Sequence, residues 1–213
     1  MLAGIFIGVA SILYARCDNP IIGAILFSVG LLACLIHNTE PAWSNNNINH
    51  AWLCTGKANY PWYALFHRNQ FVAWQCVCME FAGWLRLFAI NGFFALWIGV
   101  MARLCIDCGK INDIMANKLS HPWYWILFMG FICGILIQIG VRAYRSSSTY
   151  WPIVSMCVAA FLLLGGEHCI ADAAFVGMWQ SPGGWNAAIS CVKLIVLSAV
   201  GNLLSGALFG DKL

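Results

Sequence analysis

Long apolar runs separated by short polar stretches dominate the chain. The first run covers residues 2–15 and ends at Arg16 and Asp18. Its apolar residues are continuous rather than alternating, and the same holds for the later runs, so the pattern predicts helices rather than strands. The later runs cover residues 21–36, 71–105, 123–141, 150–164 and 185–209. Within the third run, residues 85–103 are expected to form the span itself.

The composition narrows the class of protein. Of the 213 residues, 62% are apolar and only 9% are charged, and the mean hydropathy is +0.78. Soluble domains carry about 25% charged residues, and a soluble exterior cannot be built from so few. These values argue against a cytosolic enzyme, a nucleic-acid binder and a disordered chain. Since a span needs about 20 residues, we expect an all-α polytopic membrane protein with six transmembrane helices.

The same order of features occurs in two halves, at about residues 1–105 and 121–209. Small or polar residues interrupt the second helix of each half, at residues 53–56 and at residues 165–168. Three spans per half is an odd number, so the halves must insert in opposite senses. Inverted repeats with broken helices are typical of transport sites at the repeat interface. The sequence therefore predicts a single transmembrane channel domain over residues 1–213, with broken second and fifth helices.

Polar residues inside the spans are candidates for function. Glu167 and His168 directly follow a Gly pair in the fifth segment. Two interpretations remain open for them: a transport site, or a structural role in which His168 satisfies a buried carbonyl and Glu167 caps a half-helix. Asn91 and Asn202 can likewise join helices or line a pore.

Cysteine usage gives no metal or redox site. Most of the eleven cysteines lie inside apolar runs, where they behave as small buried hydrophobes. Cys105 and Cys108 have ligand-like spacing, but no second pair or nearby His accompanies them. We therefore expect no metal, no cofactor, no catalytic residue and no enzyme activity; a membrane thiol enzyme would need a second redox pair.

Five segments resemble the formate/nitrite transporter family, and they occur in the family's order. They are GAILFSVGLL, LCTGK, FICGILIQIGV, FLLLGGEHCIAD and AVGNLLSGALFG. The resemblance implies a homopentamer of six-helix protomers with an aquaporin-like shape, each with its own pore. It implies passage of a small monovalent anion or weak acid such as formate, nitrite or hydrosulfide. Such a protein lies among membrane lipid, here expected to be a bacterial inner (plasma) membrane, and has no nucleic-acid partner.

The resemblance also assigns roles to residues. Phe27 and Leu53 would form one pore constriction and Phe161 the other, and Leu31 and Ile137 would line the wall. The expected proton relay and pore mouths consist of polar residues. Thr55 and His168 would face each other with Glu167 behind, Lys118 would lie in a vestibule, and Asn91 and Asn202 would lie near the pore mouths.

Some positions depart from the family pattern. Gly166 replaces the usual aromatic residue before Glu167, and Asp172 replaces the usual Asn. A polar stretch at residues 38–50 lengthens the first half and is expected to form a loop over one pore mouth. In the expected mechanism, His168 shares a proton with the anion, so that a neutral acid crosses. Channel-like and proton-coupled passage both remain open, as do a neutral-solute channel and a degenerate, non-transporting membrane protein.

Overall fold

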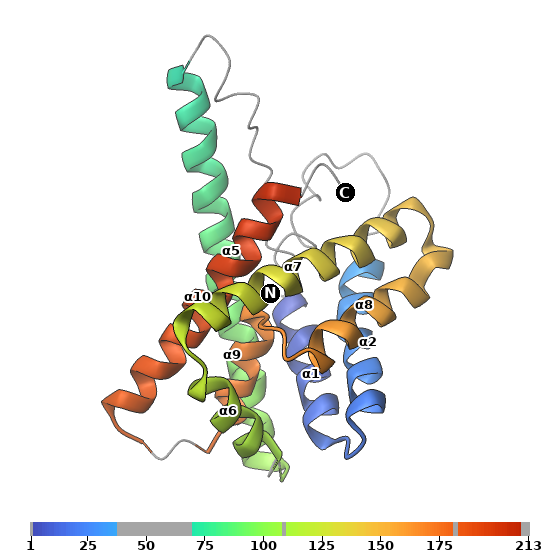
Figure 1. Cartoon of the computed structure of the whole chain (residues 1–213), viewed down its shortest axis with the longest axis vertical. Coiled ribbons are helices and arrows are strands. Elements are labelled where there is room, and N and C mark those ends of the chain that lie inside the picture. Colours follow the sequence, from blue (N-terminus) through green and yellow to red (C-terminus); the bar gives the residue numbers. More distant parts are fainter. Residues whose placement is uncertain (1, 38–69, 108–109, 181–182, 210–213) are drawn as a thin grey trace.

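A computed structural model describes residues 2–37, 70–107, 110–180 and 183–209. Within these ranges the chain is helical and contains no strand. The helices are α1 (Leu2–Arg16), α2 (Pro20–His37), α5 (Gln70–Cys105), α6 (Lys110–Ser120), α7 (Trp123–Ser146), α8 (Trp151–Leu163), α9 (Cys169–Met178) and α10 (Trp185–Phe209). A short 3-10 turn, η2 (Ser148–Tyr150), precedes α8. Figure 1 shows their arrangement.

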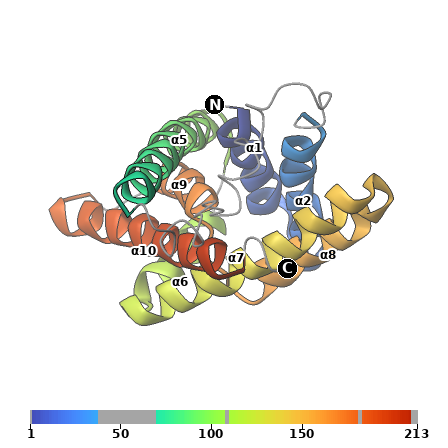
Figure 2. The same ribbon diagram turned by 90° about the horizontal axis from the view of Figure 1, so that it is seen from above.

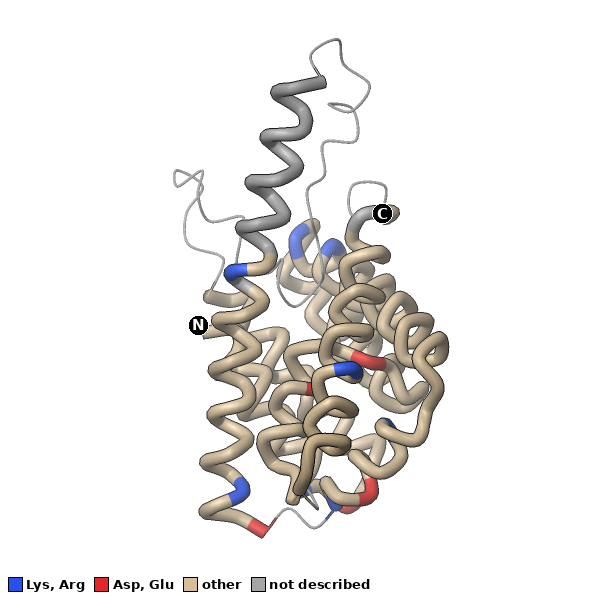
Figure 3. Tube along the Cα trace, turned by 90° about the vertical axis from the view of Figure 1, so that its left-hand side faces the viewer, with Lys and Arg blue, Asp and Glu red and all other residues tan. Residues whose placement is uncertain are grey.

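The helices have the surface of a membrane protein. Among the described residues, four helices are long and apolar enough to cross a bilayer: Pro20–His37, Phe88–Cys105, Trp123–Ser146 and Trp185–Gly206. Large apolar side chains face outward, with Trp185 85% and Met156 70% exposed. Charged residues are sparse along the trace (Figure 3). The prediction of an all-α, multi-pass membrane protein is confirmed.

Two helical hairpins and a central half-helix organise the interior. The pairs α1–α2 and α7–α8 pack as neighbours in the chain, and α2 packs against α8. Viewed from above, α9 lies enclosed among α1, α5 and α10 (Figure 2), each of which contacts it.

Small residues allow the closest of these approaches. A Cβ atom built on Gly177 of α9 would lie 2.3 Å from the carbonyl oxygen of Leu96 in α5. A Cβ atom on Gly201 of α10 would lie 2.4 Å from the carbonyl oxygen of Leu127 in α7. Small residues are how helices associate in lipid, where no hydrophobic force drives them together.

The helical path is interrupted between Leu163 and Cys169, as expected from the Gly pair. The other expected interruption, at residues 53–56, lies outside the described residues, as does the stretch 38–50. Residues 106–120, which read only as polar in the sequence, contain the helix α6. Ile111 and Met115 are buried on one of its faces, and Lys118 follows on the same face at the next turn.

Candidate functional site

A Schellman motif ends α8 and directs the chain out of the helix. The Gly166 N–H donates to the carbonyl of Phe161 over 2.6 Å, and the Gly165 N–H donates to the carbonyl of Leu162 over 3.1 Å. Gly165 has φ +73°, the left-handed conformation that glycine adopts without strain. The turn delivers Glu167 and His168 into the interior, where they are 0% and 4% exposed.

His168 caps the N-terminus of α9. Its backbone is extended, with φ −120°, and its Nδ1 accepts a hydrogen bond from the Ala171 N–H over 3.4 Å. An Nδ1 that accepts leaves the proton of the neutral ring on Nε2. The structural interpretation expected Glu167 to cap the half-helix, but the N-cap residue is His168. The imidazole ring lies 6.2 Å from the ring of Phe161, between centroids.

Asn202 of α10 holds the break in place. Its side-chain amide donates to the carbonyl of Glu167 over 2.9 Å and to the carbonyl of Gly130 over 2.8 Å. Its Oδ1 accepts from the Cys169 N–H over 3.1 Å. Asn202 is 2% exposed, so these bonds form away from solvent and join α7, α10 and the start of α9.

Asn91 makes a comparable link in the other half of the chain. Its Oδ1 accepts from the Gly4 N–H over 2.9 Å and thereby joins α5 to α1. Asn91 is 1% exposed. Both asparagines thus bond to the backbone of neighbouring helices, and their expected position near the pore mouths stays a prediction.

A buried cluster of one base and two acids lies beside the break. The Lys118 ammonium of α6 forms an ion pair with Oε2 of Glu167 and another with Oδ1 of Asp172, the latter at 3.0 Å. The side chain of Lys118 is 12% exposed and the two carboxylates are 0% exposed. We call these three residues the Lys118 cluster.

The carboxylates determine the charge state of Lys118. Burial alone lowers the pKa of its ammonium, but the charges of Asp172 and Glu167 outweigh burial and raise that pKa above its ordinary value. The ring of Phe175, with its centroid 5.7 Å from Nζ, gives a cation–π contact. Lys118 therefore stays charged and neutralised by its partners, rather than presenting a free positive charge.

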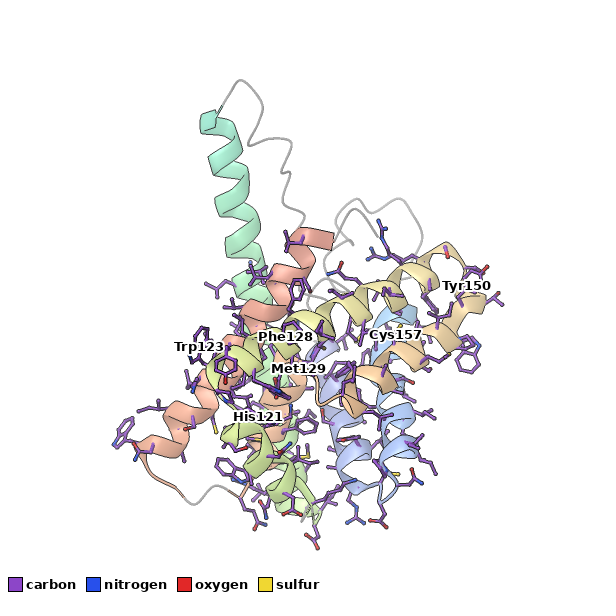
Figure 4. All side chains as sticks on the ribbon, in the orientation of Figure 1. His121, Trp123, Phe128, Met129, Tyr150 and Cys157 are labelled. Carbon is purple, nitrogen blue, oxygen red and sulfur yellow. The ribbon has the colours of Figure 1, made fainter. Side chains whose placement is uncertain are left out.

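A cavity of about 230 Å³ borders the cluster. His121, at the connection between α6 and α7 (Figure 4), stacks on Trp125 with ring centroids 3.7 Å apart. Burial, followed by the charge of Lys118, lowers the pKa of His121. The cavity is lined by residues of α1, α6, α7, α8, the break and α9: Tyr14, Ile114, Asn117, Lys118, His121, Trp125, Leu162, Leu163, Gly165, Gly166, Glu167 and Phe175.

Aromatic side chains continue inward from this cavity. Tyr14 lies edge-on to Phe27 at 6.4 Å, and Phe27 lies edge-on to Phe161 at 6.0 Å, between ring centroids. The family resemblance assigned Phe27 and Phe161 to different pore constrictions. In the structure their two rings contact each other. Leu31 and Ile137 are each 2% exposed. Leu53 and Thr55, the remaining predicted pore residues, lie outside the described residues.

Asp172 is the site residue that sequence reasoning did not select. It stands out in the sequence only as a departure from a family pattern, yet it supplies half of the negative charge around Lys118. Cys105 is an exposed free thiol, and Cys108 lies outside the described residues.

Comparisons with known proteins identify what the chain is similar to. A family model described as formate/nitrite transporter matches residues 1–211. A solved structure described as "FNT family ion channel" shares 18% identity with a TM-score of 0.67, over 98% of this chain and 84% of that one. Another, described as "Pentameric formate channel with formate bound", shares 21% identity with a TM-score of 0.61, over 98% of this chain and 90% of that one. At these identities the structures show a common fold. A search of curated proteins found no match.

Proposed function

Because the chain belongs to the formate/nitrite transporter family, we propose that it carries a small monovalent anion across a membrane through a pore in each protomer. The proposed substrates are small anions of weak acids, such as formate, nitrite or hydrosulfide. The family match over nearly the whole chain is the observation that carries this proposal. One of the two similar structures is a formate channel with formate bound, which supports it.

The pore is proposed to run past the break between α8 and α9. His168 is its central polar residue, with Thr55 opposite and Glu167 behind. The aromatic contact between Phe27 and Phe161, and the contact between Phe161 and His168, support an apolar constriction next to this polar centre. The other residues of the constriction are Leu31, Leu53 and Ile137. Such a constriction excludes hydrated ions because water leaves it.

Proton exchange at His168 would lower the cost of passage. A bare anion in a low-dielectric constriction costs tens of kcal/mol by a Born estimate. A weak acid that gains a proton crosses without that cost. His168 suits this exchange, because its Nδ1 is engaged by the Ala171 N–H while the proton of the neutral ring is on Nε2. The cavity beside Lys118 would be the vestibule from which the anion enters.

The finer architecture is part of the same proposal. We place six membrane helices in two inverted three-helix repeats, at about residues 1–105 and 121–209, in one channel domain over residues 1–213. Asn91 of α5 accepts from the Gly4 N–H of α1, and Asn202 of α10 donates to the Gly130 carbonyl of α7. In each half an asparagine of the last helix thus bonds to the first helix, which supports this pairing of repeats. The pentameric structure among the similar ones supports a homopentamer. Asn91 and Asn202 would lie toward the two pore mouths, and a bacterial inner membrane is the proposed location.

Flux measurements on purified protein in liposomes test the function. We expect formate, nitrite or hydrosulfide uptake above that of empty liposomes, with little flux of glycerol. His168→Asn is the sharpest variant, because an Asn side chain preserves an acceptor at the N-cap and removes only the titratable ring. It should assemble like the parent and alter the pH dependence of flux. Absence of anion flux from the parent would contradict the proposal, and glycerol flux in its place would favour the neutral-solute channel.

A further inference from the structure

The charges of the Lys118 cluster do not balance. One ammonium faces two carboxylates, Glu167 and Asp172, so full ionisation leaves a net charge of −1. Both carboxylates are 0% exposed. An uncompensated buried charge is costly, and proteins avoid that cost by binding or releasing a proton.

The cluster also has fewer hydrogen-bond donors than its carboxylate oxygens need. Glu167 Oε1 and Asp172 Oδ2 have no hydrogen-bond partner among the described residues. Each carboxylate thus uses one oxygen on Lys118 and leaves the other buried without a donor. A proton on either oxygen would supply the missing donor and remove the excess charge together.

We propose that Glu167 and Asp172 share one proton at neutral pH, and that this proton sets the pH range in which the pore admits an anion. The second part rests on the proposed function, and the first part does not. With the proton bound, the cluster is neutral and an anion can approach His168. As pH rises, the proton leaves for water in the adjoining cavity, the cluster becomes negative, and the anion is repelled.

Other titratable groups face the cluster from the packed elements. They are Tyr14 of α1, His121 after α6, Cys133 of α7, and His168 and Cys169 at the start of α9. Phenol and thiol groups carry no charge near neutral pH. Imidazole is the side chain whose ordinary titration lies closest to neutral pH, so the test must separate carboxyl protons from imidazole protons.

Infrared spectroscopy of the purified protein makes that separation, because a protonated carboxyl has its own C=O stretch. The parent should show this band near neutral pH. Asp172→Asn should lose the band, since Lys118 then balances Glu167 without a proton. Asp113→Asn, which removes an exposed acid from the same helix as Lys118, should keep it. If Asp172→Asn does not fold, Glu167→Gln removes the other acid and should lose the band as well. A band unchanged in either buried-acid variant, or absent from the parent, would overturn the shared proton.

The pH profile of anion flux tests the second part. Above the pH at which the cluster releases its proton, flux through the parent should fall relative to Asp172→Asn by up to about tenfold per pH unit, as one linked proton requires. Protonation of formate itself affects both proteins equally, so their flux ratio isolates the cluster. A constant ratio, with anion flux present in the parent, would contradict the control by Asp172 and leave the proposed function intact. Absence of flux at every pH would contradict the proposed function, and the infrared band would still decide the proton.

Discussion

The side-chain amide of Asn202 donates a hydrogen bond over 2.9 Å to the backbone carbonyl of Glu167. The side-chain carboxylate of Glu167 forms an ion pair with Lys118. The same asparagine accepts from the Cys169 N–H, so it fixes the chain on both sides of His168. The position of the proposed proton-exchanging ring therefore depends on a side chain of another helix.

Asn202→Ala should destabilise the protein. It removes three buried hydrogen bonds, two to backbone carbonyls and one from a backbone N–H, and each is worth about 0.5–1.5 kcal/mol. We expect a clear fall in the thermal midpoint of the detergent-solubilised oligomer, measured by size-exclusion chromatography after heating. Asn112→Ala is a matched control, because Asn112 accepts a single exposed bond from Gln180 at 3.4 Å. Equal midpoints for the two variants would show that Asn202 does not hold the break.

Gly165→Ala should also destabilise the break. The left-handed conformation at φ +73° costs an L-residue roughly 1–2 kcal/mol. The nearest side-chain atom to an added Cβ is 3.4 Å away on Trp125, so backbone strain rather than a clash is expected. Thermal midpoints measure the effect. Leu164→Ala, at a neighbouring position that is 57% exposed and right-handed, should change the midpoint little. A Gly165→Ala protein as stable as the parent would contradict the expected turn.

The sequence predicts best those features that depend on continuous apolar composition. The runs at residues 185–209 and 150–164 predict helices that agree with α10 and α8 within a residue. The run at 123–141 underestimates α7, which continues to Ser146. Arg142 and Arg145 end the apolar run but not the helix, because charge is tolerated where a helix leaves the bilayer.

The Lys118 cluster was harder to predict from the sequence. Lys118 and Asp172 are 54 positions apart, and only the return of α9 beside α6 brings them together. Residues 106–120 contain no apolar run, and only the helical spacing of Ile111 and Met115 indicates the helix that presents Lys118. The contact of Phe27 with Phe161 depends likewise on the packing of α2 against α8, which no local pattern specifies.

Gly177→Ala should separate α9 from α5. The added Cβ would lie 2.3 Å from the Leu96 carbonyl oxygen and 3.0 Å from the Val100 nitrogen, both backbone atoms that cannot rotate away. Overpacking of this kind costs about 1–3 kcal/mol. Gly92→Ala in α5 is the matched control, because its Cβ meets nothing within 4 Å among the described residues. We expect a lower thermal midpoint for Gly177→Ala and no loss for Gly92→Ala. The reverse order would contradict the close packing of α9.

His121 should make the folded state less stable as pH falls. Burial and the charge of Lys118 lower its pKa in the folded protein below the ordinary value of about 6.5. Below that value the unfolded chain binds a proton that folded His121 resists, so the free energy of unfolding decreases with falling pH. His121→Gln removes this contribution and leaves the carboxylates unchanged. The thermal midpoint of the parent should therefore fall more steeply than that of His121→Gln between about pH 7 and pH 5.

At pH 8 the His121 ring is neutral in both the folded and the unfolded protein. The difference in midpoint measured there gives the effect of the substitution itself, including the lost stacking on Trp125. A difference that stays constant from pH 8 to pH 5 would show that His121 titrates alike in the folded and unfolded protein.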